Sequence, residues 1–267
     1  MRFGGSIVSM ALLGALALPS PALAAFHLME IEQVIGGVNG DTTAQAVQLR
    51  MRTGGQNLLA GNARLRAWDA AGLNPVLLVA FSGANPAVPT GCARILIATP
   101  AFELMTTPPV TALARNYVMA QIPAGYLAAG SLTFENATGT LIYWRVSWGG
   151  AAYTGPGTVT TTAGGGNDAD GTMNPPFASP LPPLLPSTGL DGLLFTPACA
   201  TAPTNNSLQY LLSTSPAIFR NNAGSAFTVT APPPPPVPIF PGSAGLALVV
   251  ALGALASGAA VLRRRRA

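Results

Sequence analysis

This sequence contains little of the chemistry that catalytic and metal sites use most often. Its 267 residues include one histidine, two cysteines and no lysine, and charged residues make up 8% of the chain, against about 25% in an ordinary soluble domain. Most nucleophilic and zinc sites require His or Cys side chains. We therefore expect a protein that is not an enzyme and that has no resident cofactor.

The few charges are also unevenly distributed. All 13 basic residues are arginines, and five of them lie at the ends of the chain, at Arg2 and at 263–266. The other 8 arginines face 9 acidic residues, which leaves a net charge of −1 between the ends. A nucleic-acid-binding protein carries a basic face on its folded part. The charge distribution therefore argues against nucleic acid as a partner.

Residues 1–24 have the three parts of a secretory signal peptide. Arg2 supplies the charge, Ile7–Leu18 forms a short apolar run, and Ala22 and Ala24 are small residues at the positions that a signal peptidase reads. The pattern predicts export, with cleavage after residue 24. An ordinary buried N-terminal helix is the alternative.

The C-terminal region predicts a membrane segment. Ser243–Leu262 is a run of 20 uncharged residues, long enough as a helix to span the apolar layer of a bilayer, about 30 Å. The arginines that follow, in 263–267, favour a cytoplasmic tail. Residues 231–242 precede the run as a proline-rich, extended linker. We expect this region to contact the inner membrane during export.

Val237–Pro241 before the apolar run, together with Arg263–Arg266 after it, resembles the PEP-CTERM sorting signals of Gram-negative surface proteins. The resemblance implies processing by an exosortase-like membrane enzyme and delivery to the cell surface or extracellular matrix. Without processing, the helix would remain as a plain membrane anchor. The sequence reads Val-Pro-Ile-Phe-Pro where the family usually has Val-Pro-Glu-Pro. The residues that carry the resemblance are Val237, Pro238, Pro241, Arg263, Arg264, Arg265 and Arg266.

Between the ends, residues 25–230 alternate with a period of two, which is typical of β-strands. In 44–52, Val47, Leu49 and Met51 alternate with polar residues and predict a half-buried strand with a polar outer face. Other predicted strands cover 30–35, 63–68, 75–81, 94–98, 117–122, 132–135, 140–148, 207–212 and 226–229. About eight to ten short strands separated by turn residues favour an all-β sandwich. Residues 149–203 lack alternation and are expected to form an irregular Gly/Pro-rich insertion.

Met29–Ile35 and Ala46–Arg50 near the start of this region, with Asn206–Gln209 near its end, resemble lamin-tail-like domains. The resemblance implies an immunoglobulin-like β-sandwich, found in bacteria on secreted and surface proteins, and it supplies no catalytic residues. Gln48 stands where the family usually has Glu. The segments that carry the resemblance are Met29–Ile35, Gly40–Asp41, Ala46–Arg50, Asn206–Gln209, Pro216 and Arg220–Gly224.

The two cysteines are the clearest structural candidates. Outside the cytoplasm, Cys92 and Cys199 are expected to pair in a disulfide. The bond would connect the end of the insertion to the turn at Gly91. Two separate buried thiols are the alternative.

Two possible binding sites lie near the insertion. Asn167, Asp168 and Asp170 alternate and are followed by Gly171, a pattern that suits Ca²⁺, although a solvated turn would look the same. The aromatic group of Trp144, Trp148 and Tyr153 could stack on sugar rings if part of it faces outward, whereas ordinary core packing is the alternative. Because Tyr143 and Trp144 are neighbours in a strand, we expect them on opposite faces.

Glu30 and Glu32 are separated by one residue, so they are expected to share the solvated face of a strand. The sequence as a whole predicts a non-enzymatic structural or interaction protein of the bacterial envelope or extracellular matrix. Its expected partners are envelope proteins or polysaccharide. The alternative is a glycan- or Ca²⁺-dependent binding module that uses the Trp148–Gly171 region.

Overall fold

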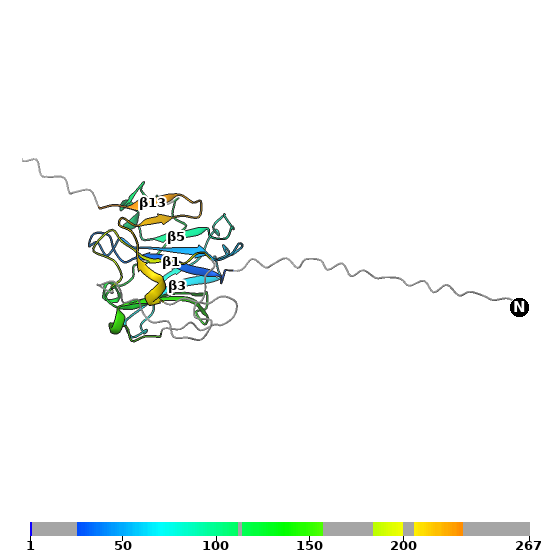
Figure 1. Ribbon diagram of the computed structural model, residues 1–267, viewed down its shortest axis with the longest axis horizontal. Helices are drawn as coiled ribbons and strands as arrows, with labels where there is room; N and C mark the ends of the chain where they lie inside the picture. The colour runs from blue at the N-terminus through cyan, green and yellow to red at the C-terminus, as the bar shows by residue number, and fades with distance from the viewer. Residues whose placement is uncertain (2–25, 112–113, 157–183, 200–205, 232–267) are drawn as a thin grey trace, which may run out of the picture. The chain divides into compact units, whose positions relative to one another are not determined.

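The structure, a computed structural model, describes residue 1 and residues 26–111, 114–156, 184–199 and 206–231. The described part is all-β and is built from three sheets (Figure 1). The predicted signal peptide and the predicted membrane segment 243–262 lie outside the described residues. The longest described α-helix has four residues, and none of the described helices could cross a membrane.

The largest sheet has six strands in the order β11-β10-β1-β2-β5-β7. Neighbouring strands are antiparallel except for β5 and β7, which are parallel. The strands are β1 (Met29–Ile35), β2 (Ala46–Met51), β5 (Arg94–Ala98), β7 (Tyr117–Val118), β10 (Leu193–Phe195) and β11 (Tyr210–Leu212).

The second sheet has four antiparallel strands in the order β4-β3-β8-β9. Its strands are β3 (Ala63–Trp68), β4 (Val76–Ala80), β8 (Gly130–Asn136) and β9 (Ile142–Trp148). The predicted strands 132–135 and 140–148 correspond to β8 and β9, which form a hairpin whose turn contains Gly139 with a φ of 71°. On β3 buried and half-buried residues alternate, and the half-buried Arg64 lies with its Nε 3.0 Å from Glu135 Oε2 of β8.

The third sheet has three strands in the order β12-β13-β6. They are β6 (Thr106–Thr107), β12 (Ile218–Arg220) and β13 (Ala226–Val229). Four short helical turns complete the described elements: α1 (Asn206–Gln209) and the 3₁₀ turns η1 (Phe102–Leu104), η2 (Ala124–Tyr126) and η3 (Gly150–Ala152).

The main core lies between the six-stranded and four-stranded sheets. Leu49 and Ile95 from the first sheet and Phe134 and Trp144 from the second belong to one buried cluster. A sandwich of two sheets is therefore present, as the alternation predicted. Burying large apolar side chains in this way is the main source of stability in such a fold.

A second core covers part of the other face of the six-stranded sheet. Ala46 and Leu96 belong to a separate buried cluster with Phe219 and Phe227 of the third sheet, and the ring of Phe219 lies 5.2 Å from that of Phe102. The six-stranded sheet is thus covered on both faces, which the sequence did not predict. The expected strand at 117–122 is shorter than predicted, β10 falls inside the expected irregular insertion, and 206–209 is helical before β11 begins.

Replacing Phe219 with alanine should destabilise the protein by about 3–5 kcal/mol, because the large ring is removed from a closed apolar cluster. Its neighbour Ile218 is 45% exposed, so Ile218→Ala on the same strand should reduce the free energy of unfolding by less than about 1 kcal/mol. Urea unfolding of the two variants measures the difference. Similar losses for both would show that the second core contributes little.

Candidate functional site

The candidate site begins with an irregularity in β1. Ile31 pairs with Leu49, and Gln33 pairs with Gln48, so that Glu32 is an extra residue in the register between β1 and β2. Such a β-bulge interrupts the alternation of faces. As a result Glu32 and Gln33 both line one cleft, together with Gln48, whereas Ile31 and Leu49 lie in the main core.

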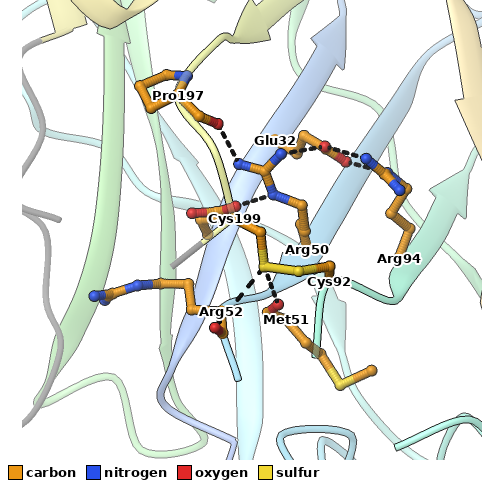
Figure 2. The surroundings of a disulfide bond; sticks show 9 residues. Glu32, Arg50, Met51, Arg52, Cys92, Arg94, Pro197 and Cys199 are labelled. Atoms are coloured by element: carbon orange, nitrogen blue, oxygen red, sulfur yellow. Dashed lines mark hydrogen bonds and ion pairs between the residues drawn. A yellow bond between two sulfur atoms is a disulfide. The ribbon is translucent and has the colours of Figure 1, made fainter. Parts of the chain in front are cut away.

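Arg50 of β2 forms ion pairs with both acidic residues of β1, and Figure 2 shows its contact with Glu32. Its Nε forms an ion pair with Glu30, its Nη1 lies 2.8 Å from Glu32 Oε1, and its Nη2 donates to the carbonyl of Pro197 at 2.9 Å. All three nitrogens of the guanidinium group are therefore engaged. This satisfies a charge that burial would otherwise make unfavourable.

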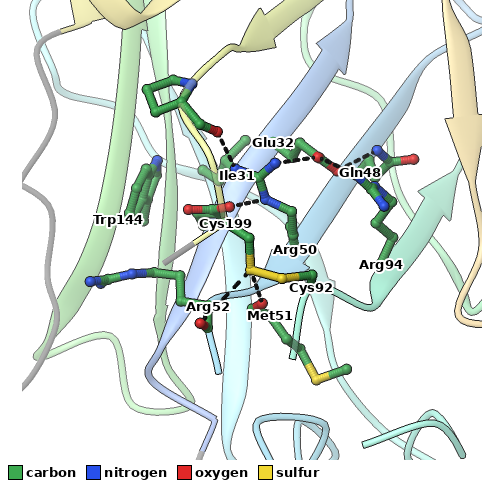
Figure 3. A network of polar contacts seen from close by, with 12 residues as sticks. Ile31, Glu32, Gln48, Arg50, Met51, Arg52, Cys92, Arg94, Trp144 and Cys199 are labelled. Atoms are coloured by element: carbon green, nitrogen blue, oxygen red, sulfur yellow. Dashed lines mark hydrogen bonds and ion pairs between the residues drawn. A yellow bond between two sulfur atoms is a disulfide. The ribbon is translucent and has the colours of Figure 1, made fainter. Parts of the chain in front are cut away.

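Glu32 is held by three side chains from β2 and β5 (Figure 3). Arg94 of β5 donates from Nε at 2.8 Å and from Nη2 at 2.9 Å, one bond to each carboxylate oxygen. Gln48 Nε2 adds a bond of 2.6 Å, and Arg50 supplies the fourth. A two-pronged arginine–carboxylate pair is among the strongest and most directional contacts between side chains.

These contacts correct the expectation of a solvated strand face. Glu30 is 0% exposed and Glu32 is 3% exposed. The alternation along β1 correctly places Glu30 away from the main core, but it contains no information about what covers that face. The segment carrying Pro197 is separated from β2 by 147 residues in the sequence and packs across Arg50.

The carboxyl group of Glu30 has a strongly shifted pKa. Its pKa is raised from 4.5 to about 7, with burial as the largest cause; the charge and hydrogen bond of Arg50 oppose the rise, the charge of Glu32 adds to it, and Arg52 opposes it. Within the described residues Glu30 Oε2 accepts no hydrogen bond. Desolvation therefore outweighs the ion pair for this carboxyl.

The expected disulfide is confirmed. Cys92 and Cys199 are bonded, with their Cα atoms 5.7 Å apart and a sequence separation of 107. Cys92 lies in a turn with a φ of 66°, and Cys199 Sγ lies 3.3 Å from the carbonyl oxygen of Met51 (Figure 2). The bond thus attaches the segment of Pro197 beside the end of β2, where that segment covers Arg50.

Two clefts adjoin this network. The first, of about 360 Å³, lies over the polar face of the six-stranded sheet, and the second, of about 320 Å³, lies beside the turn of Cys92. Arg94 and Arg220 line both clefts. Gln48 Oε1 accepts a hydrogen bond from the backbone N–H of Arg220, which links β12 to the same polar network.

The aromatic candidates for sugar stacking are buried. Trp144 and Trp148 are fully buried, and Tyr153 is buried as well; Trp144 Nε1 donates to Tyr210 Oη at 2.7 Å. The expectation that Tyr143 and Trp144 face opposite ways is wrong, because both belong to the main core. The reason is a bulge in β9: Phe134 pairs with Trp144 and Glu135 with Ile142, which leaves Tyr143 as an extra residue.

The calcium candidates Asn167, Asp168 and Asp170 lie outside the described residues. In the part of the chain that the structure describes, no group of three or more His, Cys, Asp or Glu residues is placed to hold a metal ion.

Sequence reasoning missed Arg50, Arg94 and Arg220 as members of one site. A signal for the first two exists, because Arg50 and Arg94 lie in predicted strands and Glu30 and Glu32 in a third. The order of those strands in the sheet was not available from the sequence. Arg220 lies in β12, which no pattern predicted.

Comparison with protein-family models, with curated proteins and with solved structures found no match to this chain. The functional argument therefore depends on the geometry of the polar network, the disulfide and the two clefts.

The raised pKa of Glu30 predicts a pH-dependent stability. Between its ordinary pKa of 4.5 and about 7, the folded protein binds more protons than the unfolded chain, so this group makes the free energy of unfolding fall as pH rises. A difference of this size corresponds to roughly 3 kcal/mol. Glu30→Gln removes the titrating group and should remove that fall, as measured by urea unfolding at about pH 5 and about pH 8.

Asp69→Asn is the matched control. Hydrogen bonds from the Leu73 N–H and from Asn74 lower the pKa of Asp69, so this carboxylate is ionised throughout the window in both states. The control should keep the pH dependence of the wild type. An unchanged slope in Glu30→Gln would contradict the assignment.

Removing the disulfide should destabilise the protein strongly. The double change Cys92→Ser and Cys199→Ser releases a closed loop of 107 residues, for which the chain-entropy estimate is roughly 4–5 kcal/mol. The same loss is expected for the wild type unfolded under reducing conditions, which serves as the control. A loss below about 1 kcal/mol would show that the unfolded chain is not constrained as this estimate assumes.

Proposed function

We propose that this chain is an exported, non-enzymatic structural or interaction protein of the bacterial envelope or extracellular matrix. The observation that carries the proposal is the Cys92–Cys199 disulfide. Structural disulfides form and persist in oxidising compartments and are rare in the cytoplasm. The bond closes about half of the folded part of the chain into one loop, as suits a protein that must survive outside the cell.

The two ends of the sequence support the same proposal. Residues 1–24 would direct export, and Ser243–Leu262 with the arginines that follow would hold the chain in the inner membrane. A PEP-CTERM-like signal containing Pro238 and Pro241 would then be processed by an exosortase-like enzyme. Without processing, the protein would stay anchored by its C-terminal helix.

The finer fold assignment is part of the proposal. We infer a lamin-tail-like, immunoglobulin-like sandwich, on the basis of the resemblance in Met29–Ile35 and Ala46–Arg50. The pairing of β1 with β2 in one sheet of a two-sheet core is compatible with it. The third sheet, β12-β13-β6, is an addition to the two layers of such a sandwich.

The alternative function predicted from the sequence is the binding of a glycan or Ca²⁺ by the Trp148–Gly171 region. Trp148 and Tyr153 offer no stacking surface, because both are buried, and the oxygen ligands of that region lie outside the described residues. The clefts lined by Arg94 and Arg220 are a better starting point for a binding function.

Export and processing are tested together by intact mass. The full chain is expressed in a Gram-negative host. The protein isolated from the outer membrane or the medium should have the mass of a chain that begins after residue 24 and ends near Pro241. A mass that retains Arg263–Arg266 would contradict processing and leave a lasting anchor. Full-length chain in the cytoplasm, with both cysteines open to alkylation, would contradict export.

A further inference from the structure

The two clefts beside the buried network share a pair of arginines. Arg94 comes from β5 and Arg220 from β12, and both line the first and the second cleft. We call the surface formed by the two clefts the arginine groove. The six-stranded sheet forms its floor. Thr196, three residues before Cys199, lines the first cleft, and Cys92 lines the second.

Both arginines retain hydrogen-bond donors. Arg94 uses Nε and Nη2 on Glu32, and within the described residues its Nη1 has no partner; its side chain is 32% exposed. Arg220 is exposed, and the one side-chain contact that the structure gives it is a long one, 3.5 Å from Nη1 to the carbonyl of Gly224. Unused guanidinium donors at a cleft are suited to a carboxylate or another oxyanion.

The local charge favours an anion. Arg50, Arg94 and Arg220 line the groove, against Glu32 alone, and Glu30 lies behind Arg50. Counting both acids gives three positive and two negative groups. The segment between the chain ends has a net charge of −1, so the groove is more positive than the segment as a whole.

The uncharged lining favours a carbohydrate over an acidic protein. Hydroxyl and amide side chains, which match the hydroxyls of sugars, line both clefts. Leu194, Phe195, Val88 and Ile218 are the large apolar residues of the lining. Of these, Ile218 alone ranks among the exposed large hydrophobic residues of the described chain, so the groove offers few apolar anchors for peptide side chains. The polar lining residues are Gln33, Gln48, Thr90, Thr196, Ser213, Thr214, Asn221 and Asn222.

We infer that the arginine groove binds a carboxylate-bearing polysaccharide, with the guanidinium groups of Arg94 and Arg220 on the carboxylates of a uronic-acid chain. Sugar hydroxyls between the carboxylates bond to the amide and hydroxyl side chains of the lining. The inference deepens the proposed function, which places the protein among envelope and matrix polysaccharides. It is tested on purified protein, so its failure is separate from a failure of export.

The experiment is calorimetric titration of the full chain, in mild detergent, with short oligogalacturonate as the probe. The four arginines 263–266 are changed to glutamine in every protein compared, because they would attract any polyanion. Binding should weaken with added salt, and fully methyl-esterified oligogalacturonate should not bind.

Arg220→Gln should weaken binding roughly tenfold or more, the loss expected for a charge-assisted hydrogen-bond pair. Arg220→Lys keeps the charge without the planar fork, so its affinity should lie between those of the wild type and of Arg220→Gln.

Arg64→Gln is the matched control, because it removes one positive charge from the four-stranded sheet, where Arg64 pairs with Glu135. It should leave affinity within about twofold of the wild type. The inference is overturned if oligogalacturonate does not bind, if the methyl ester binds equally well, or if Arg220→Gln and Arg64→Gln behave alike. Tighter binding of poly-glutamate than of oligogalacturonate would also overturn it and would assign the groove to an acidic protein.

Discussion

The six-stranded sheet is covered on both of its faces, and the arrangement of the rest of the described chain depends on this constraint. One face packs on the four-stranded sheet through an apolar core. The other is apolar where Ala46 and Leu96 meet the third sheet and charged where Glu30 and Arg50 lie. A buried charged surface is tolerated when its charges are paired, and here Arg50 forms ion pairs with both Glu30 and Glu32.

The disulfide and the network stabilise the same place. Cys199 holds its segment beside the end of β2, and the carbonyl of Pro197 in that segment accepts from Arg50. Glu30, the group with the raised pKa, is an ion-pair partner of the same arginine. The oxidation state of the two cysteines and the protonation state of Glu30 therefore both affect one region, the side of the sheet where the groove opens.

Overall neutrality and local charge have different consequences for binding. A nearly neutral chain has little long-range attraction for charged partners, which fits a matrix or scaffold component. At the groove, however, three arginines from β2, β5 and β12 converge, and Glu32 is already occupied by four hydrogen bonds. Such a site discriminates at short range, where hydrogen-bond geometry decides.

The sequence by itself determined the class of fold and the covalent link. The alternation of Val47 and Leu49 with Gln48 predicted a strand and the side chains that face the main core. The expectation that this strand is half-buried is wrong, because its polar face is buried as well. Two cysteines in a chain with a predicted export signal predicted one disulfide. These features depend on local period and on composition. Only the tertiary structure decided that Glu32 and Tyr143 are bulged, that Glu30 is buried, and that Arg94 and Arg220 share a groove. Bulges and coverage depend on which distant strand lies alongside, and that pairing is a property of the whole folded chain.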